Sequence, residues 1–322
     1  MKDKNNKLFI SMYHYIRDLK YSRYPNIKGM DIRQFRAQME FFRDNFNVVK
    51  MEQVIEAVKS GGKLPQNAVL LTFDDGYIDH YTYVFPVLEE FGFQGSFFIP
   101  GKPISEHKLL DVNKIHHILA CADIKSLVID VKERMNHYRG SEYNYASTDE
   151  LWNQYAIENR FDSKEVVFIK RVLQTALPEP VRNKISSDLF ERYVDVSEEQ
   201  VASELYMSEE QIGVMRRHGM FIGLHGYEHY WLGNLTREEM ACDISKAMMV
   251  MCEYINPKEW VMNYPYGNYS LDVISYVESK GACVGLTTKV QVADIEVDSA
   301  LELPRLDCND FPPQSNDYIY YL

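Results

Sequence analysis

The sequence predicts an α/β protein built around a parallel sheet. Short apolar runs alternate with segments whose apolar residues recur at helical spacing, and glycine or proline separates many of these segments. This alternation is typical of parallel strands joined by crossover helices. A second observation is the apolar run at residues 69–73, which ends in Asp74 and Asp75, as a buried strand with a polar end would. With 322 residues, 46% of them hydrophobic, the chain can bury a substantial core.

The first half of the alternation covers residues 8–99. A first strand is expected at residues 8–15, with His14 near its end, and Asp31 can cap the helix that follows to about residue 45. The remaining expected elements are an extended piece at 48–49, a helix at 51–60, the strand at 69–73, a helix at 78–91 and a strand at 93–99.

The alternation stops between residues 102 and 217. This stretch contains helical patterns and little strand signal, so we expect a mainly helical insertion. Such an insertion either shapes what reaches a site at the rim of a barrel or provides contacts between subunits. The helical patterns lie at residues 112–120, 163–175 and 180–193.

The alternation resumes at Ser208. Ser208 and Gln211 have the spacing of a capping box, which predicts a helix to about residue 218. Thr236 and Glu239 form a second capping box and predict a longer helix to about residue 254. The other expected elements are strands at 220–224, 260–262 and 282–286, a helix at 270–280 and a last extended piece at 301–306.

Charge, hydropathy and cysteine usage exclude several classes of protein. The net charge is −12 and the basic residues do not cluster, which argues against a nucleic-acid partner. No apolar run approaches the ~20 residues that a membrane-spanning helix needs, and residues 1–7 lack the pattern of a secretory leader. The five cysteines are scattered, as expected of reduced thiols, and their spacing disfavours a zinc–thiolate site. We therefore expect a cytoplasmic protein without a membrane span.

Asp74 and Asp75 form the first candidate site. Adjacent carboxylates are costly to bury without partners, so a strand that ends in this pair is expected to meet a metal, another cation or water. The carboxyl ends of parallel strands are also where α/β proteins bind their ligands. The alternative is an ordinary Asp-Asp-Gly turn.

His225 and His229 form the second candidate site. They lie four residues apart, directly after an expected strand. On a helical turn this spacing brings two side chains within ~6 Å, close enough to share a metal. Together with a carboxylate from the Asp74-Asp75 pair they would give a His2Asp set with open positions for water or substrate, as catalytic metals require. The alternative is a pair of surface histidines.

The order of these segments resembles a known motif series. Residues 72–76 (Thr-Phe-Asp-Asp-Gly), then His225 and His229, then residues 264–267 (Tyr-Pro-Tyr-Gly), are similar to the motifs of the NodB-homology polysaccharide deacetylases, carbohydrate esterase family 4. Tyr-His at 13–14 and Leu-Pro at 64–65 fit one branch of this family. The resemblance implies a distorted (β/α) barrel of the NodB type, with residues 1–322 as a single catalytic domain and residues 102–217 as a helical insertion within it.

The resemblance also implies roles for individual residues. Asp74 would be the general base, and Asp75, His225 and His229 would hold a divalent metal. The backbone N–H of Tyr266 would help to stabilise the oxyanion that forms during attack on an acetamide. We expect zinc as the metal, although the donor set also suits cobalt, nickel, manganese or iron.

The third motif departs from the family pattern. The family usually has an arginine two residues before the proline, where this chain has Asn263. Arg305 and Asp307 lie at the end of a late expected strand and are candidates to orient the base and the substrate in its place. The alternative is a surface arginine that follows a proline.

The last motif also departs from the pattern, because no histidine follows His229. The family usually has one there as the general acid. His14 is the candidate replacement, since the first strand of a barrel delivers its C-terminal residues to the same face. The alternative is a structural histidine. His80 is a weaker candidate for the acid.

Tyr227 is the remaining candidate for substrate contact. It lies between the two histidines, and with Tyr230 and Trp231 it would stack on the apolar face of a sugar, or else pack in the core. The sequence thus leads us to expect a metal-dependent hydrolase that removes N-acetyl groups from a saccharide or glycan precursor. Two alternatives stay open: removal of formyl or another N-acyl group, and a member that binds a glycan without hydrolysing it.

Overall fold

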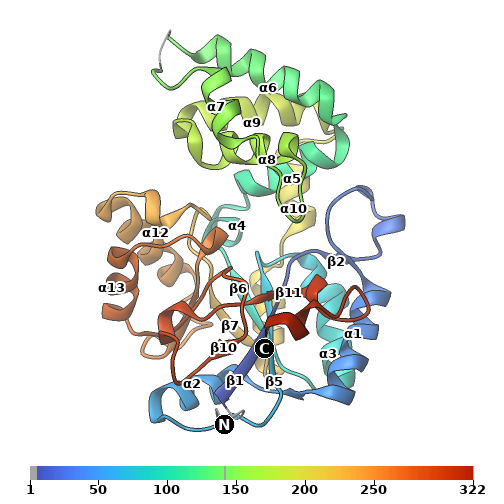
Figure 1. The fold of residues 1–322 in the computed structure, drawn as a ribbon, viewed down its shortest axis with the longest axis vertical. Coiled ribbons are helices and arrows are strands. Elements are labelled where there is room, and N and C mark those ends of the chain that lie inside the picture. The colour runs from blue at the N-terminus through green and yellow to red at the C-terminus, as the bar shows by residue number, and fades with distance from the viewer. Residues whose placement is uncertain (1–5, 141–142, 322) are drawn as a thin grey trace. The chain divides into compact units, whose positions relative to one another are not determined.

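The structure, a computed structural model, describes residues 6–140 and 143–321. These residues form two compact units. The first comprises residues 6–19, 29–107 and 204–321, and the second comprises residues 20–28 and 108–203. Figure 1 labels many of the helices and strands. Among the residues described, no helix is long and apolar enough to cross a membrane.

The first unit is built on a curled sheet. Its strands follow the order β10-β1-β5-β6-β7-β8-β9, and β4 and β11 pair with β5 and β1. All neighbours are parallel except β1 and β10, which confirms the predicted parallel α/β sheet. The strands are β1 (Lys7–Tyr13), β4 (Asn47–Val48), β5 (Ala68–Asp74), β6 (Gly95–Ile99), β7 (Phe221–Leu224), β8 (Trp260–Asn263), β9 (Ala282–Leu286), β10 (Ala293–Asp294) and β11 (Leu306–Asp307). Two more strands, β2 (Ile16–Arg17) and β3 (Met30–Asp31), form a small separate parallel sheet.

The ends of the curled sheet are joined by one short segment. Leu303 bridges to Leu286 in β9, and Leu306 pairs with Ser11 in β1. The backbone between these pairs therefore spans the gap between the first and the last parallel strands. Arg305 lies in this segment, which gives it a route to the end of β5.

Helices connect the strands of the first unit. The capping boxes predicted at Ser208 and Thr236 are both present, as is the cap at Asp31. A π-helix over His80–Val84 precedes α3, where the sequence predicts one continuous helix. The helices are α1 (Ile32–Asn45), α2 (Met51–Ser60), α3 (Phe85–Phe91), α4 (Gly101–Glu106), α11 (Glu209–Arg217), α12 (Arg237–Val250) and α13 (Leu271–Ser279).

Strand β5 runs through the core, and all seven of its residues are buried. Successive side chains point to opposite faces of a strand. Val69, Leu71 and Phe73 accordingly join one apolar cluster, and Ala68 and Leu70 join the other. A continuous apolar run was the sequence signal for this strand, and burial on both faces is its physical reason.

The second unit is helical. Its helices are α5 (Asp111–Cys121), α6 (Ile124–Tyr138), α7 (Thr148–Tyr155), α8 (Lys164–Arg171) and α9 (Glu179–Tyr193), and α10 (Glu198–Leu205) begins in it. Most of this unit falls inside residues 102–217, and residues 20–28 join it from a distant part of the sequence. The assignment of residues 102–217 as an insertion within a single catalytic domain stays a prediction.

Candidate metal centre

Two tight turns place the candidate ligands. β5 ends at Asp74, and the next residue, Asp75, has a φ of 75°. After β7, Gly226 has a φ of 69° and His229 has a φ of 58°. Positive φ is unfavourable for residues that carry a Cβ atom, and such strain concentrates at functional sites. The left-handed turn at Asp75 thus contributes, together with strand alternation, to the direction of its carboxylate.

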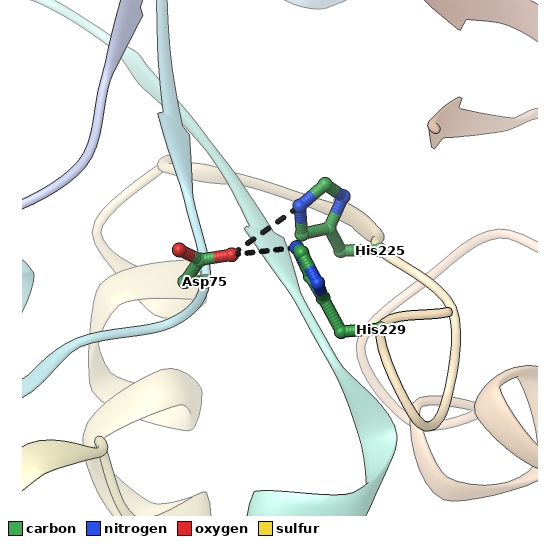
Figure 2. A group of neighbouring side chains, drawn as sticks. All are labelled: Asp75, His225 and His229. Carbon is green, nitrogen blue, oxygen red and sulfur yellow. Dashed lines mark ion pairs between the residues drawn. The ribbon is translucent and has the colours of Figure 1, made fainter. Parts of the chain in front are cut away.

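Asp75, His225 and His229 converge on one point (Figure 2). Asp75 Oδ1 lies 3.3 Å from His225 Nε2 and 3.2 Å from His229 Nε2. The potential ligand atoms all lie within 4.8 Å of one another, and all three side chains are buried. Burial by itself would raise the pKa of Asp75, but the two imidazoles hold it well below its usual value. The carboxylate is therefore ionised.

The hydrogen bonds around this group suit a metal ion. His225 Nδ1 lies 2.7 Å from the carbonyl oxygen of Asn263. A carbonyl only accepts, so Nδ1 carries the proton and Nε2 is the nitrogen available for coordination. Asp75 Oδ1 is a buried atom without a hydrogen bond of good geometry among the residues described. Two imidazole nitrogens and one carboxylate oxygen are a common donor set for zinc and other divalent transition metals.

Asp74 lies beside this group and pairs with Arg305. Arg305 Nη1 and Nη2 donate to the two oxygens of Asp74, each at 2.9 Å. The Arg305 side chain is 1% exposed, so this arginine is buried rather than on the surface. Burial by itself would raise the pKa of Asp74, but Arg305 is the main group that lowers it to about 2. A two-pronged guanidinium contact fixes the direction of the carboxylate as well as its charge.

His14 faces Asp74 from the end of β1. His14 Nε2 lies 3.8 Å from Asp74 Oδ2, and its side chain is 41% exposed. His80 donates a ring N–H to the backbone oxygen of His14 at 3.0 Å. His80 itself is buried against the rings of Phe73 and Phe97, and burial lowers its pKa to about 4. His80 is thus neutral and holds the backbone of His14 by this hydrogen bond, whereas the His14 side chain reaches solvent.

Tyr266 contacts one of the candidate ligands, His229. It has a φ of 58° in the turn after β8, and its ring contacts His229 edge-on with the centroids 4.6 Å apart. Trp231 stacks on Tyr266 with a centroid distance of 5.0 Å. The two aromatic rings therefore stand next to the candidate ligands. Their contact with a sugar stays a prediction.

Tyr227 and Asp307 are both occupied by contacts within the protein. Tyr227 is 7% exposed, and its hydroxyl donates to Glu106 in α4 at 2.6 Å. This environment favours the core interpretation of Tyr227 over the sugar-stacking one. Asp307 caps a short 3-10 helix, where its Oδ1 accepts from the backbone N–H of Asn309 at 2.9 Å. Within the described residues, Arg305 forms hydrogen bonds to the Asp74 carboxylate, whereas Asp307 serves as a helix cap.

Two supporting residues were missed in the sequence. Asn263 Oδ1 accepts from Arg305 Nη2 at 2.9 Å. Asn263 stands where the family usually has an arginine, and here it helps to hold Arg305, which comes from a later part of the chain. Asp243 accepts from the backbone N–H groups of Tyr227 and Glu228 at 2.8 and 2.9 Å and fixes the loop between the histidines. Asp243 had a sequence signal, because it is an acid on the apolar face of its helix.

The fold is an α/β half-barrel, and an Asp-His-His cluster lies beyond the ends of its strands. These two features define a class of α/β proteins with a candidate metal centre. A family model described as "Polysaccharide deacetylase" matches residues 61–137 and 188–284, more than half of the chain. The chain belongs to the polysaccharide deacetylase family. The predicted resemblance to NodB-homology deacetylases is therefore confirmed.

Two sequence relatives illustrate the range of the family. The chain is 20% identical over 288 residues to the "Putative polysaccharide deacetylase YxkH" of Bacillus subtilis, which is 89% of this chain and 66% of the relative. It is 47% identical over 57 residues to the "Poly-beta-1,6-N-acetyl-D-glucosamine N-deacetylase" of Escherichia coli, which is 17% of this chain and 8% of the relative. The chain thus spans just under two thirds of the first relative and a small part of the second.

Solved structures confirm the fold. The deacetylase PplD of Streptococcus pyogenes, in complex with acetate, aligns with a TM-score of 0.57 at 14% identity and covers 98% of this chain and 96% of its own. IcaB from Ammonifex degensii aligns with a TM-score of 0.57 at 17% identity and covers 98% and 97%. The predicted distorted (β/α) barrel is confirmed by these likenesses.

Proposed function

We propose that this protein is a metal-dependent hydrolase that removes N-acetyl groups from a saccharide or polysaccharide. The observation that carries the proposal is the convergence of Asp75, His225 and His229 beside a buried, ionised Asp74. Membership of the polysaccharide deacetylase family supports the reaction class. The names of the relatives support an N-acetylated glycan as the substrate.

Asp75, His225 and His229 would hold the metal, and zinc fits their donor set well. A divalent ion bound there would polarise the amide carbonyl and acidify a water molecule. The tautomer of His225 is set by the carbonyl oxygen of Asn263, so this histidine is prepared for coordination through Nε2.

Asp74 would accept the proton of the attacking water. Its carboxylate is kept ionised and aimed by the two bonds from Arg305, and Asn263 and the backbone oxygen of Thr287 hold Arg305 in turn. Arg305 therefore takes over the task of the arginine that the third motif lacks. A base that is already oriented needs no reorganisation when the reaction starts.

Two further roles, stabilisation of the oxyanion and protonation of the leaving amine, would fall to residues around the metal ligands. The backbone N–H of Tyr266 would donate to the oxygen that becomes negative during attack. His14 would protonate the leaving amine, because it reaches solvent and stands 3.8 Å from Asp74.

Replacing Asp74 with asparagine tests the assignment. Asp74→Asn keeps the size of the side chain and removes the proton acceptor, so we expect a loss of acetate release from N-acetylglucosamine oligomers of at least about 100-fold. Metal content should stay near that of the wild type. Asp272→Asn, on the exposed start of α13, is the matched control and should keep full activity. Unchanged acetate release by Asp74→Asn would contradict the role of the base.

The same assay separates the alternatives. Release of formate or another acid in place of acetate, from the corresponding N-acyl sugars, would identify a different N-deacylase. Binding of both metal and oligosaccharide without any acid product would identify a glycan-binding member that does not hydrolyse its ligand.

A further inference from the structure

Tyr77 contacts one oxygen of the Asp75 carboxylate. Its hydroxyl lies 2.6 Å from Asp75 Oδ2, and the side chain is fully buried. Asp75 Oδ1 is the oxygen that faces the two imidazoles, at 3.2 and 3.3 Å. The two oxygens of this carboxylate therefore have different surroundings. Oδ2 accepts a hydrogen bond from Tyr77, and Oδ1 faces the candidate metal position.

The direction of the hydrogen bond follows from the two groups. A phenol carries a proton to donate, and a carboxylate that serves as a metal ligand only accepts. The Tyr77 hydroxyl accordingly donates to Asp75 Oδ2. A bond from a phenol to a carboxylate is a strong, charge-assisted one.

The Tyr77 ring is fixed on several sides. Tyr15 stacks on it with the centroids 4.0 Å apart and the planes 15° from parallel. The backbone of Tyr77 pairs with Tyr206, and the N–H of Met207 donates to the oxygen of Gly76 at 3.0 Å. These contacts hold the ring in the position from which its hydroxyl reaches Asp75.

We propose that Tyr77 is a positioning residue that makes Asp75 a one-oxygen metal ligand. The inference rests on the proposed metal-dependent function. An oxygen that already accepts a strong hydrogen bond is a poorer metal ligand, so Oδ2 stays with Tyr77 and Oδ1 is left for the metal. A one-oxygen contact leaves more coordination positions open for water and substrate, as a catalytic site requires. The hydrogen bond from Tyr77 also offsets part of the conformational free energy that is needed to hold Asp75 in a turn with positive φ.

Tyr77→Phe tests the proposal, because it removes one hydroxyl and keeps the ring. The metal-free proteins are titrated with Zn²⁺ in competition with a chromophoric chelator, at a temperature at which melting curves show both to be folded. We expect the Kd for Zn²⁺ to rise about 10- to 100-fold, the usual effect of removing a partner of a metal ligand. With Co²⁺ the d–d absorption spectrum should also change, since Asp75 becomes free to bind through both oxygens.

Tyr276→Phe in α13 is the matched control. It removes a tyrosine hydroxyl that donates to the backbone oxygen of Ala241 at 3.2 Å and should leave the Kd for Zn²⁺ unchanged. If the wild type binds Zn²⁺ and Tyr77→Phe binds it with the same Kd and the same Co²⁺ spectrum, the role of Tyr77 is overturned while the proposed function stands. If the wild type binds no divalent metal, the proposed function fails, and the inference fails with it.

Discussion

Replacing Arg305 with methionine leaves the Asp74 carboxylate buried without its partner. The pKa of Asp74 falls from 3.8 to about 2 in the folded protein, and at 1.36 kcal/mol per unit this shift alone corresponds to about 2.5 kcal/mol. The oxygens of Asn263 and Thr287 also lose the donor that they share. Removing one partner of a buried ion pair typically costs about 3–5 kcal/mol. We therefore expect Arg305→Met to lose about 3–5 kcal/mol of unfolding free energy at pH 7.

Urea unfolding of the metal-free proteins measures this loss. Arg36→Met is the matched control, because Arg36 forms its ion pair with Glu90 at an exposed surface and should change little. The double variant Asp74→Leu/Arg305→Met should be more stable than Arg305→Met alone, since it removes the unpaired charge as well. Arg305→Met with the unfolding midpoint and slope of the wild type would refute the reasoning.

Two further predictions concern the histidines near Asp74. His14→Ala should lower acetate release about 100- to 10,000-fold, as expected for loss of a general acid, with an unchanged Kd for metal; full turnover would remove His14 from the reaction. His80 has a pKa lowered from 6.5 to about 4, so the unfolded chain binds its proton first as the pH falls, and stability is lost below about pH 6.5. Between pH 7 and pH 5 this group should lower the free energy of unfolding by about 2 kcal/mol. In urea unfolding at a series of pH values, His80→Phe should lose less stability over this range than the wild type. An equal loss in both proteins would contradict the buried, neutral state of His80.

The local signals in the sequence were sufficient for most elements. The capping boxes at Ser208 and Thr236 act within one helical turn, so their meaning does not depend on the rest of the fold. The apolar run of β5 was equally clear, because a strand that is buried on both faces consists mainly of apolar residues. Helix lengths were less certain, and the helix expected at residues 78–91 contains a π-helical turn at its start.

Contacts between distant segments carried no such signal. Arg305 and Asp74 are separated by 231 residues. The expected strand end made Arg305 a candidate to orient Asp74, but the sequence left a surface arginine as an equal alternative. Tyr77 follows the Asp-Asp-Gly turn closely, yet its partner became visible only when the direction of the Asp75 carboxylate was known. For Tyr227 the sequence left both a sugar contact and a core position open, and its hydrogen bond to Glu106 in α4 could not be foreseen.

The sequence by itself determined the ligand types, their order and the strands that carry them, because strand periodicity and motif spacing are properties of short segments. The tertiary structure decided which residue orients Asp74 and which oxygen of Asp75 faces the imidazoles. Those choices depend on how the segment around Arg305 joins β9 to β1 and on how Tyr15 stacks on Tyr77. Charge pairing and ring packing act between atoms that are neighbours in space, and the linear order of residues does not contain that information.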